Sequence, residues 1–203
     1  RSTDGLYSQT YAYPPETILS HTFFFHKTEE FYRFYRDKML YLDAKPNKAH
    51  QKLAEWEKSG KLKAVITQNI DGLHQEAGNE KVLELHGSVL RNYCESCRKF
   101  FGVEAIKNSE GIPRCECGGI IKPDVVLYEE GLDNYTISES VRRISEADVL
   151  IIGGTSLAVY PAAGLIDYYR GNKLVLINKT PTPKDHMANL VIQGSIGEVF
   201  EQL

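Results

Sequence analysis

The sequence predicts an α/β fold, in which a doubly wound parallel sheet carries two small inserted modules, one helical and one a zinc ribbon. Short apolar runs alternate with helical patterns along the chain, which is typical of parallel strands joined by crossover helices. Four of these runs end in small polar clusters, and two pairs of cysteines interrupt the pattern near the middle of the chain. The alternation predicts the sheet, and the cysteines predict the zinc ribbon.

The composition is that of an ordinary globular protein. The 203 residues are 42% hydrophobic and 25% charged, and the formal net charge is -3. This charge gives no general attraction to nucleic acid or to an anionic membrane, and no apolar run approaches the ~20 residues of a membrane span. No signal peptide is visible, and close cysteine pairs indicate metal binding in a reducing compartment. We therefore expect a cytoplasmic protein with neither nucleic-acid nor membrane partners.

The first part of the chain, about residues 8–49, is expected to form a helical module. The Pro-Pro-Glu run at residues 14–16 suits a helix start, and Thr28 resembles an N-cap before acidic first-turn residues. Phe31 and Tyr35 belong to an aromatic stripe at helical spacing. We expect this stripe to pack into a core.

The next segment reads as a helix followed by a strand. Asn47 is a candidate N-cap for a helix that ends at Gly60. Residues 64–66 then form a short buried strand, and the polar residues 67–71 follow it directly. Such a cluster, just past the C-terminal end of a strand, lies where open α/β sheets bind ligands.

Two histidines are candidates for a catalytic base. His86 follows the apolar run at residues 82–85 and precedes Gly87, so it ends a predicted strand, whereas His74 lies on a short predicted helix. Because strand ends carry chemistry more often in open sheets, we prefer His86, and a histidine with an ordinary pKa of about 6.5 suits proton transfer near neutral pH. From this stretch alone, a polar loop with a surface histidine is an equally good interpretation.

The cysteines predict a structural metal site. Cys94 and Cys97 form a C-x-x-C pair, and Cys115 and Cys117 follow after 17 intervening residues (98–114). Two thiolate pairs at this separation match a four-cysteine zinc ribbon. The second pair has one residue between its ligands instead of the usual two, and the two glycines after it supply flexibility. Four thiolates close the coordination shell, so we expect one structural zinc ion and no catalytic role for it.

The C-terminal half returns to alternating helices and strands. We expect a helix over residues 139–147 and buried strands over 148–152 and 173–178. Glycines and hydroxyls follow the first of these strands at residues 153–156, which suits a phosphate- or ribose-binding turn. Asn178 ends the second strand. Because the carboxyl ends of parallel strands meet at one edge, these clusters together favour a nucleotide site.

At this point the chain resembles the sirtuins, the NAD-dependent protein deacylases, of the bacterial type. The resemblance implies a Rossmann-like NAD-binding domain at residues 1–90 and 125–203, with the helical module inserted at about 8–49, and a zinc-ribbon module at 91–124. The matching segments, in the family order, are Arg1-Ser2, Thr67-Gln68-Asn69-Ile70-Asp71, Leu85-His86-Gly87, the two cysteine pairs, Pro123-Asp124-Val125-Val126, Gly154-Thr155-Ser156-Leu157, Val159-Tyr160-Pro161-Ala162 and Ile177-Asn178.

The resemblance also implies a role for individual residues. His86 would be the general base that acts on the ribose hydroxyls of NAD. Val126, Tyr128 and Val159 would bind the acyl-lysine peptide, whose backbone would pair as an added strand. The residues expected to bind the cofactor are Arg1, Gln68, Asn69, Ile70, Asp71, Thr155, Ser156, Asn178 and Ile196.

The implied activity is that of an NAD-dependent protein-lysine deacetylase, which transfers the acetyl group from an acetylated protein or peptide to ADP-ribose and releases nicotinamide. Family members that prefer succinyl or malonyl groups carry a Tyr-x-x-Arg pair. Here Tyr32 is followed three residues later by Tyr35, and Arg36 is one place off, which favours a neutral acyl group. Glu129 stands where the family commonly has glycine, so the peptide preference near Tyr128 is left open.

Two other functions are alternatives. One is a non-catalytic module that binds ADP-ribose or acyl-lysine peptides, and the other is a protein mono-ADP-ribosyltransferase that uses the same pocket. In the family, a strand and a Gly-Ala-Gly loop precede the segment that Arg1 begins. We expect the sequence to be truncated at this point, because that loop holds the pyrophosphate of NAD.

Overall fold

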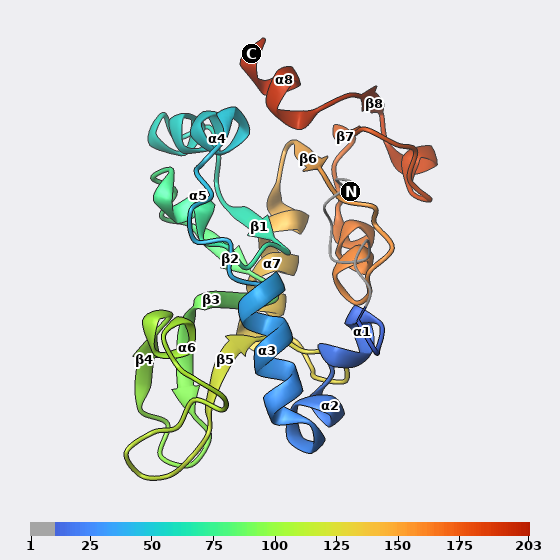
Figure 1. The fold of residues 1–203 in the computed structure, drawn as a ribbon. Helices are drawn as coiled ribbons and strands as arrows, with labels where there is room; N and C mark the ends of the chain where they lie inside the picture. The colour runs from blue at the N-terminus through green and yellow to red at the C-terminus, as the bar shows by residue number, and fades with distance from the viewer. Residues whose placement is uncertain (1–10) are drawn as a thin grey trace. The chain divides into compact units, whose positions relative to one another are not determined.

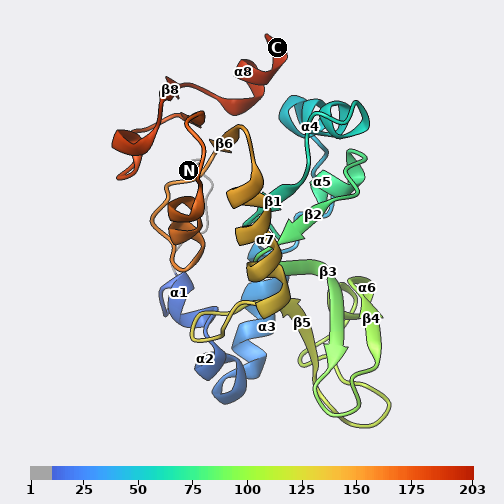
Figure 2. The ribbon, with the colours of Figure 1, turned by 180° about the vertical axis from the view of Figure 1, so that it is seen from behind.

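The computed structural model describes residues 11–203, and these form two compact units. Figure 1 shows the chain coloured from its N-terminus to its C-terminus, and Figure 2 shows it from behind. Each unit is built from separate stretches of the sequence. The described residues of the first unit are 11–44, 69–72 and 86–132, and those of the second unit are 45–68, 73–85 and 133–203.

The first unit opens with three helices, α1 (Pro15–Ile18), α2 (His21–His26) and α3 (Thr28–Lys38). The predicted aromatic stripe lies on α3 and forms a core, in which the rings of Phe31 and Tyr35 stack with their centroids 5.5 Å apart. Thr28, expected to be the N-cap of α3, is its first residue. Its hydroxyl donates to the carbonyl of Phe24 at 2.7 Å, so it satisfies the preceding turn instead of capping the helix.

An antiparallel sheet completes the first unit, with β3 (Gly87–Cys94) between β4 (Phe100–Gly102) and β5 (Ile121–Val125). The short helix α6 (Glu104–Lys107) follows β4. Val89 of β3 and Val125 of β5 belong to the same buried cluster as the aromatic side chains of α3. The predicted helical segment and zinc ribbon therefore share one core.

The second unit begins with α4 (Lys48–Lys58), followed by β1 (Val65–Thr67), α5 (Leu73–Glu76) and β2 (Val82–Glu84). The Asn47 cap predicted from the sequence is confirmed, because its side chain accepts hydrogen bonds from the backbone N–H groups of Ala49 and His50. β1 and β2 pair in parallel, with Val65 opposite Val82. This is the helix–strand unit that the sequence pattern predicts.

A second parallel sheet follows, with β7 (Leu174–Asn178) between β6 (Leu150–Gly153) and β8 (Leu190–Gln193). On one face, α4 and α8 (Ile196–Glu201) cover Ile177, and the rings of Trp56 and Phe200 lie 5.0 Å apart. On the other face, η2 (Ala162–Tyr168) places Ile166 against Leu176. The described part of this unit also contains α7 (Asn134–Glu146) and η3 (Asp185–Met187).

Helices that cover both faces of parallel strands confirm the α/β fold class. In the described residues, the parallel strands pair as two sheets, β1–β2 and β6–β7–β8, where the pattern suggested one. The helix expected to start at residue 139 starts at Asn134. The reason is a cap, because the side chain of Asp133 accepts a hydrogen bond from the backbone N–H of Thr136 at 2.7 Å.

Candidate active site

His86 lies in the tight turn between β2 and β3, one residue before the point where β3 begins. The carbonyl of His86 accepts a hydrogen bond from the backbone N–H of Val126 at 3.1 Å. Gly87, at a φ of 75°, lies so close to β5 that a Cβ atom would come within 1.9 Å of the Asp124 carbonyl oxygen. Only glycine permits this approach. The carbonyl of His86 and the glycine that follows it are therefore held against the end of β5 and the residue after it.

The segment at residues 69–72 lies beside β3 in the same unit. The carbonyl of Ile70 accepts a hydrogen bond from the backbone N–H of Val89 at 3.0 Å. The structure thus brings Asn69, Ile70 and Asp71, which we expected to bind the cofactor, close to the strand that follows His86. Asn69 is exposed, and the other two side chains are half-buried.

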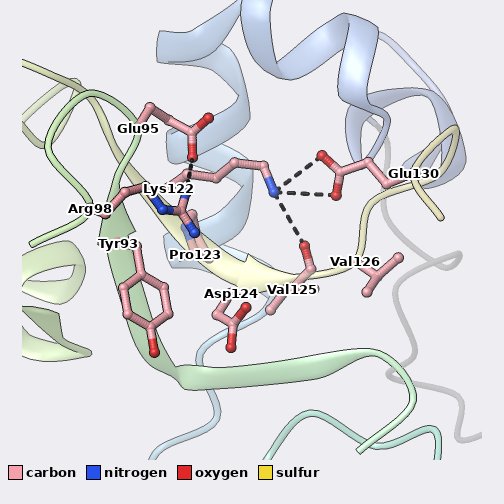
Figure 3. Close-up of a pocket in the computed structure, with 9 residues that line it drawn as sticks. All are labelled: Tyr93, Glu95, Arg98, Lys122, Pro123, Asp124, Val125, Val126 and Glu130. Carbon is pink, nitrogen blue, oxygen red and sulfur yellow. Dashed lines mark hydrogen bonds and ion pairs between the residues drawn. The ribbon is translucent and has the colours of Figure 1, made fainter. Parts of the chain in front are cut away.

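Val126 and Tyr128 lie on the chain that leaves β5. Tyr128 is bonded through its backbone on both sides, since its N–H donates to the carbonyl of Leu19 and its carbonyl accepts from the N–H of His21, both at 2.9 Å. Its side chain is 45% exposed. Val126 also lines a pocket of about 120 Å³, together with Lys122 and other residues of the first unit (Figure 3). An exposed aromatic ring on a fixed turn suits contact with an extended peptide.

The other predicted cofactor residues lie in the second unit, at the C-terminal ends of its parallel strands. The amide of Gln68, just after β1, lies 3.4 Å from the hydroxyl of Thr155, just after β6. Ser156 follows Thr155 and is exposed. Asn178 ends β7, and its side-chain amide donates to the carbonyl of Thr180 at 2.9 Å. The C-terminal ends of β1, β6 and β7 thus carry amide and hydroxyl groups, and those of β1 and β6 lie close together.

Ile196 packs against Gly153, where a Cβ atom would come within 2.1 Å of its side chain. This contact holds the start of α8 close to the end of β6, next to Thr155. Val159 is exposed in the loop before η2 and belongs to this second unit. Arg1 lies outside the described residues, so its expected contact with NAD stays a prediction.

His74, the alternative base, belongs to the second unit. Its ring lies 4.6 Å from the ring of His50, measured between centroids. His50 in turn accepts a hydrogen bond from the backbone N–H of Asn47 at 3.1 Å and completes a capping box for α4. His74 thus packs on the start of α4, and the preference for His86 stays a prediction.

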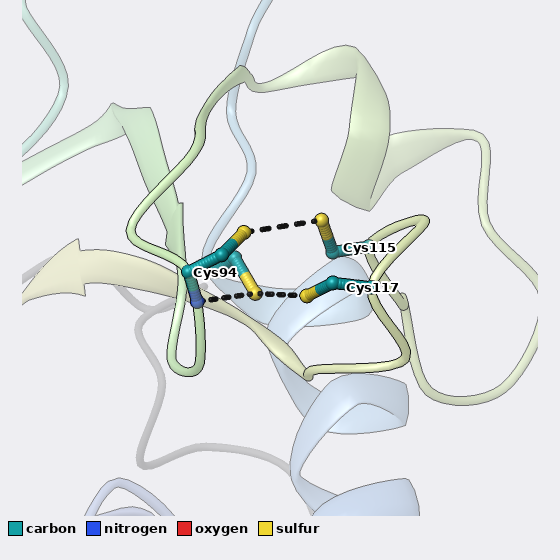
Figure 4. A group of neighbouring side chains, drawn as sticks. Cys94, Cys115 and Cys117 are labelled. Atoms are coloured by element: carbon teal, nitrogen blue, oxygen red, sulfur yellow. Dashed lines mark hydrogen bonds between the residues drawn. The ribbon is translucent and has the colours of Figure 1, made fainter.

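The four cysteines come together as the spacing predicts (Figure 4). All four sulfur atoms lie within 4.8 Å of one another, with Cys94 and Cys117 at 3.4 Å and Cys97 and Cys115 at 3.6 Å. A tetrahedral zinc ion with Zn–S bonds of about 2.3 Å requires sulfur atoms roughly 3.8 Å apart. The backbone N–H of Cys97 lowers the pKa of Cys94 to about 6, which favours the thiolate. The cluster therefore fits zinc.

Gly119 makes room for this cluster. A Cβ atom at this position would come within 2.6 Å of the Cys94 sulfur. The glycines after the second cysteine pair were expected to supply flexibility, and for Gly119 the structure adds a requirement for space.

One feature of the site has no signal in local sequence patterns. The carboxylate of Glu130 contacts Lys122 at 3.2 Å and His21 at 3.0 Å (Figure 3 shows the contact with Lys122). His21 and Glu130 are 109 positions apart in the sequence. Their contact depends on tertiary structure, which no helical or strand period reveals.

An α/β fold with polar residues at its strand ends and a four-cysteine cluster is typical of a nucleotide-binding protein with a structural metal site. The Sir2 family model matches residues 1–161, and the chain belongs to this family. It is 62% identical to the NAD-dependent protein deacetylase of Clostridium acetobutylicum, over 99% of this chain and 84% of that protein. It is 46% identical to the NAD-dependent protein deacetylase of Cutibacterium acnes, over 98% and 83%.

Solved structures give the same result. A structure of Sir2 bound to an acetylated peptide matches with a TM-score of 0.89 at 40% identity, over 97% of this chain and 84% of that chain. A structure of Sir2 with a p53 peptide and NAD+ matches with a TM-score of 0.88 at 40% identity, over 97% and 85%. The sirtuin resemblance found in the sequence is confirmed.

Proposed function

We propose that this protein is an NAD-dependent protein-lysine deacetylase, which transfers the acetyl group of an acetylated protein or peptide to ADP-ribose and releases nicotinamide. The observation that carries the proposal is the identity of 57% to 62% with three clostridial NAD-dependent protein deacetylases over nearly the whole chain. Solved relatives hold an acetylated peptide, NAD+ and acetyl-ADP-ribose. NAD and acetylated peptides are therefore the substrates.

His86 is the residue that we assign as general base. NAD, when bound, would supply the ribose carbon from which nicotinamide leaves and the ribose hydroxyls that receive the acyl group of the lysine. The neutral imidazole of His86 accepts a proton from a ribose hydroxyl, a step that contributes about 10²–10⁴-fold to the rate in comparable enzymes. The hydrogen bond from Val126 to the His86 carbonyl and the packing of Gly87 against β5 limit the movement of the backbone that carries this imidazole.

We assign the parts of NAD to the polar residues at the strand ends, and the peptide mainly to the turn after β5. We assign nicotinamide and its ribose to Gln68, Asn69, Ile70 and Asp71. We assign the adenosine half to Thr155, Ser156, Asn178 and Ile196, and the peptide to Val126, Tyr128 and Val159. The domain boundaries expected from the sequence are part of the same proposal.

The zinc ion is structural, because four thiolates leave no coordination position for a substrate. Cys94, Cys97, Cys115 and Cys117 would hold it. Four thiols in a metal site suit a reducing compartment, and we propose that the protein acts in the cytoplasm. In the described part of the chain, no helix combines the length and apolar character that crossing a membrane requires.

We expect the acyl group that the enzyme removes from lysine to be neutral. The guanidinium of Arg36 donates to the hydroxyl of Ser109 at 3.1 Å and to the carbonyl of Gly111 at 2.8 Å. The hydroxyl of Tyr32 donates to the carbonyl of Ile121. Both groups are thus engaged in the first unit, which supports acetyl over succinyl or malonyl.

The test is nicotinamide release by the full-length protein with NAD, with an acetylated peptide, and with both together. We expect release only with both, and we expect His86→Ala to reduce it at least about 100-fold while the thermal unfolding midpoint stays unchanged. His186→Ala, a change of an exposed histidine in η3, is the matched control and should keep full activity.

The two alternatives give different results in this experiment. Tight peptide binding without nicotinamide release would favour the binding module. Labelled ADP-ribose on a protein, with no acetyl-ADP-ribose formed, would favour the mono-ADP-ribosyltransferase. Wild-type activity in His86→Ala would contradict the assignment of the base.

A further inference from the structure

The turn formed by Tyr128, Glu129 and Glu130 is held firmly against the start of α2. Besides the two backbone hydrogen bonds of Tyr128, the carboxylate of Glu129 accepts a hydrogen bond from the backbone N–H of Thr22 at 2.8 Å. The carboxylate of Glu130 accepts one from the backbone N–H of Leu127 at 2.9 Å. The side chain of Glu129 therefore has a defined position directly beside Tyr128.

Glu129 adopts a backbone conformation that favours glycine. Its φ is 75°, and it is one of three non-glycine residues with positive φ among the described residues, the others being Arg98 and Leu157. For a residue with a side chain, this left-handed backbone conformation costs free energy, which a favourable contact can offset. The hydrogen bond with Thr22 supplies such a contact, so a charged residue is retained at a position that suits glycine.

The charges of Glu129 and Glu130 are compensated differently. Glu130 forms an ion pair with Lys122 and a hydrogen bond with the ring of His21. Glu129 forms no ion pair with any residue in the range 11–203. Hydrogen bonding to Thr22 lowers the pKa of Glu129, so this exposed carboxylate is negatively charged at neutral pH. The turn thus presents next to Tyr128 an exposed negative charge that is in no ion pair among the described residues, although His21 acts on it from a distance.

We propose that Glu129 is a specificity-determining residue, which favours acetylated peptides that carry lysine or arginine close to the acetyl-lysine. This inference rests on the proposed deacetylase function and on the assignment of Tyr128 to the peptide. A peptide bound along Tyr128 brings its neighbouring side chains within the ~8 Å over which charges act at physiological salt. For solvent-exposed charges, the effect is about two- to fivefold in kcat/KM.

The experiment compares two acetylated peptides that differ only in having arginine or glutamate at the residues flanking the acetyl-lysine. The quantity measured is the ratio of kcat/KM for the two peptides, at low and at physiological salt, with full-length wild type, Glu129→Gln and Glu129→Gly. Gln keeps an oxygen that accepts from Thr22 but removes the charge. Gly fits the positive φ and removes both the accepting oxygen and the charge.

We expect wild type to favour the arginine peptide, and both variants to lower the ratio about two- to fivefold, mainly through KM. Glu110→Gln is the matched control, because it removes another exposed charge, from the loop before β5. It should leave the ratio unchanged. A wild-type preference that weakens with salt would also support an electrostatic cause.

Turnover of both peptides with the same ratio in wild type and in both Glu129 variants would overturn this inference alone. An equal loss of preference in Glu110→Gln would also overturn it, because the effect would then reflect net charge. No turnover of any acetylated peptide would overturn the proposed function, and the inference with it.

Discussion

Two tyrosines of α3 differ in what their hydroxyl groups contact. Tyr32 and Tyr35 are both fully buried. The hydroxyl of Tyr32 donates to the carbonyl of Ile121, whereas the hydroxyl of Tyr35 has no hydrogen-bond partner among the described residues. A buried polar group without a partner costs about 1–3 kcal/mol. The same side chain therefore stabilises the first unit at one position and costs free energy at the other.

Replacement of each tyrosine by phenylalanine tests this difference. Tyr35→Phe should raise the free energy of unfolding by about 1 kcal/mol, because it removes an unpaired hydroxyl and keeps the ring. Tyr32→Phe, the matched control, should lower it by about 1–2 kcal/mol, because the Ile121 carbonyl loses its donor. Denaturant unfolding measures both. An equal loss in the two variants would mean that a bound water satisfies Tyr35.

At the residue scale, sequence patterns predicted much of the chemistry but few of its contacts. The cysteine spacing predicted a metal site, and all four sulfur atoms do come together. The partners of Arg36 and Glu129 could not be predicted, because Ser109 and Thr22 are 73 and 107 positions away from them in the sequence. Such contacts depend on how distant segments pack, and local spacing carries no information about that.

At the scale of elements, Glu130 joins three parts of the first unit. Its carboxylate accepts hydrogen bonds from Leu127 on the turn, from Lys122 on β5 and from His21 on α2. Burial raises the pKa of Glu130, but the hydrogen bonds from His21, Leu127 and Lys122 outweigh burial and lower it. The charged form is therefore the one that the fold stabilises.

This direction predicts how stability depends on pH. Since the pKa of Glu130 is lower in the folded than in the unfolded protein, its contribution is present above the unfolded value of about 4.3 and is lost as pH falls through the folded value. Glu130→Gln should lower the free energy of unfolding by about 1 kcal/mol at pH 7, after screening. The difference from wild type should shrink at acid pH.

Denaturant unfolding of wild type and Glu130→Gln between pH 3 and pH 7 measures this difference. Glu110→Gln is again the control, because Glu110 is exposed and forms no ion pair within residues 11–203. A constant difference between wild type and Glu130→Gln across this range would show that the carboxylate charge contributes nothing.

Element boundaries were less predictable than the elements themselves. The helix at α7 was expected from its periodicity, but its first turn lacks apolar periodicity and depends on the Asp133 cap. The observed ends of β1 and β6 also differ from the predicted ones, since β6 starts at Leu150 instead of residue 148. Capping hydrogen bonds and strand pairing decide these ends, and neither follows from hydrophobic spacing.

At the scale of the whole molecule, the zinc site is continuous with the core of the first unit. Cys94 and Cys115 belong to the same buried cluster as Phe31 and Tyr35 of α3. Without a metal ion, four thiols at close range would repel one another when ionised. Loss of zinc should therefore disturb the aromatic core as well as the loops that hold the cysteines.

Removal of zinc with a chelator should lower the thermal unfolding midpoint and weaken the near-ultraviolet circular dichroism of the core. Structural zinc contributes about 10–16 kcal/mol of binding free energy in zinc-finger peptides, so the loss should be large. Zinc added back should restore both signals, and magnesium should not. An unchanged midpoint in protein shown by mass spectrometry to be metal-free would contradict a structural role.

The fold class was predictable from the sequence, but the order in which the parallel strands pair was not. Alternating strands and helices predicted the parallel α/β architecture, which the structure confirms. The pairing of the parallel strands as β1–β2 and β6–β7–β8 could not be predicted, because apolar runs show which residues are buried and not which strands are neighbours.

The division of the chain into units has a consequence for inheritance. The chain passes from one unit to the other after Ala44, Gln68, Gly72, Leu85 and Leu132. A gene fragment that encodes the whole first unit must also encode α4, β1 and β2 of the second. Recombination at two breakpoints therefore cannot exchange one unit and leave the other intact. An exchange of one whole unit would need a separate breakpoint at each of these five crossings.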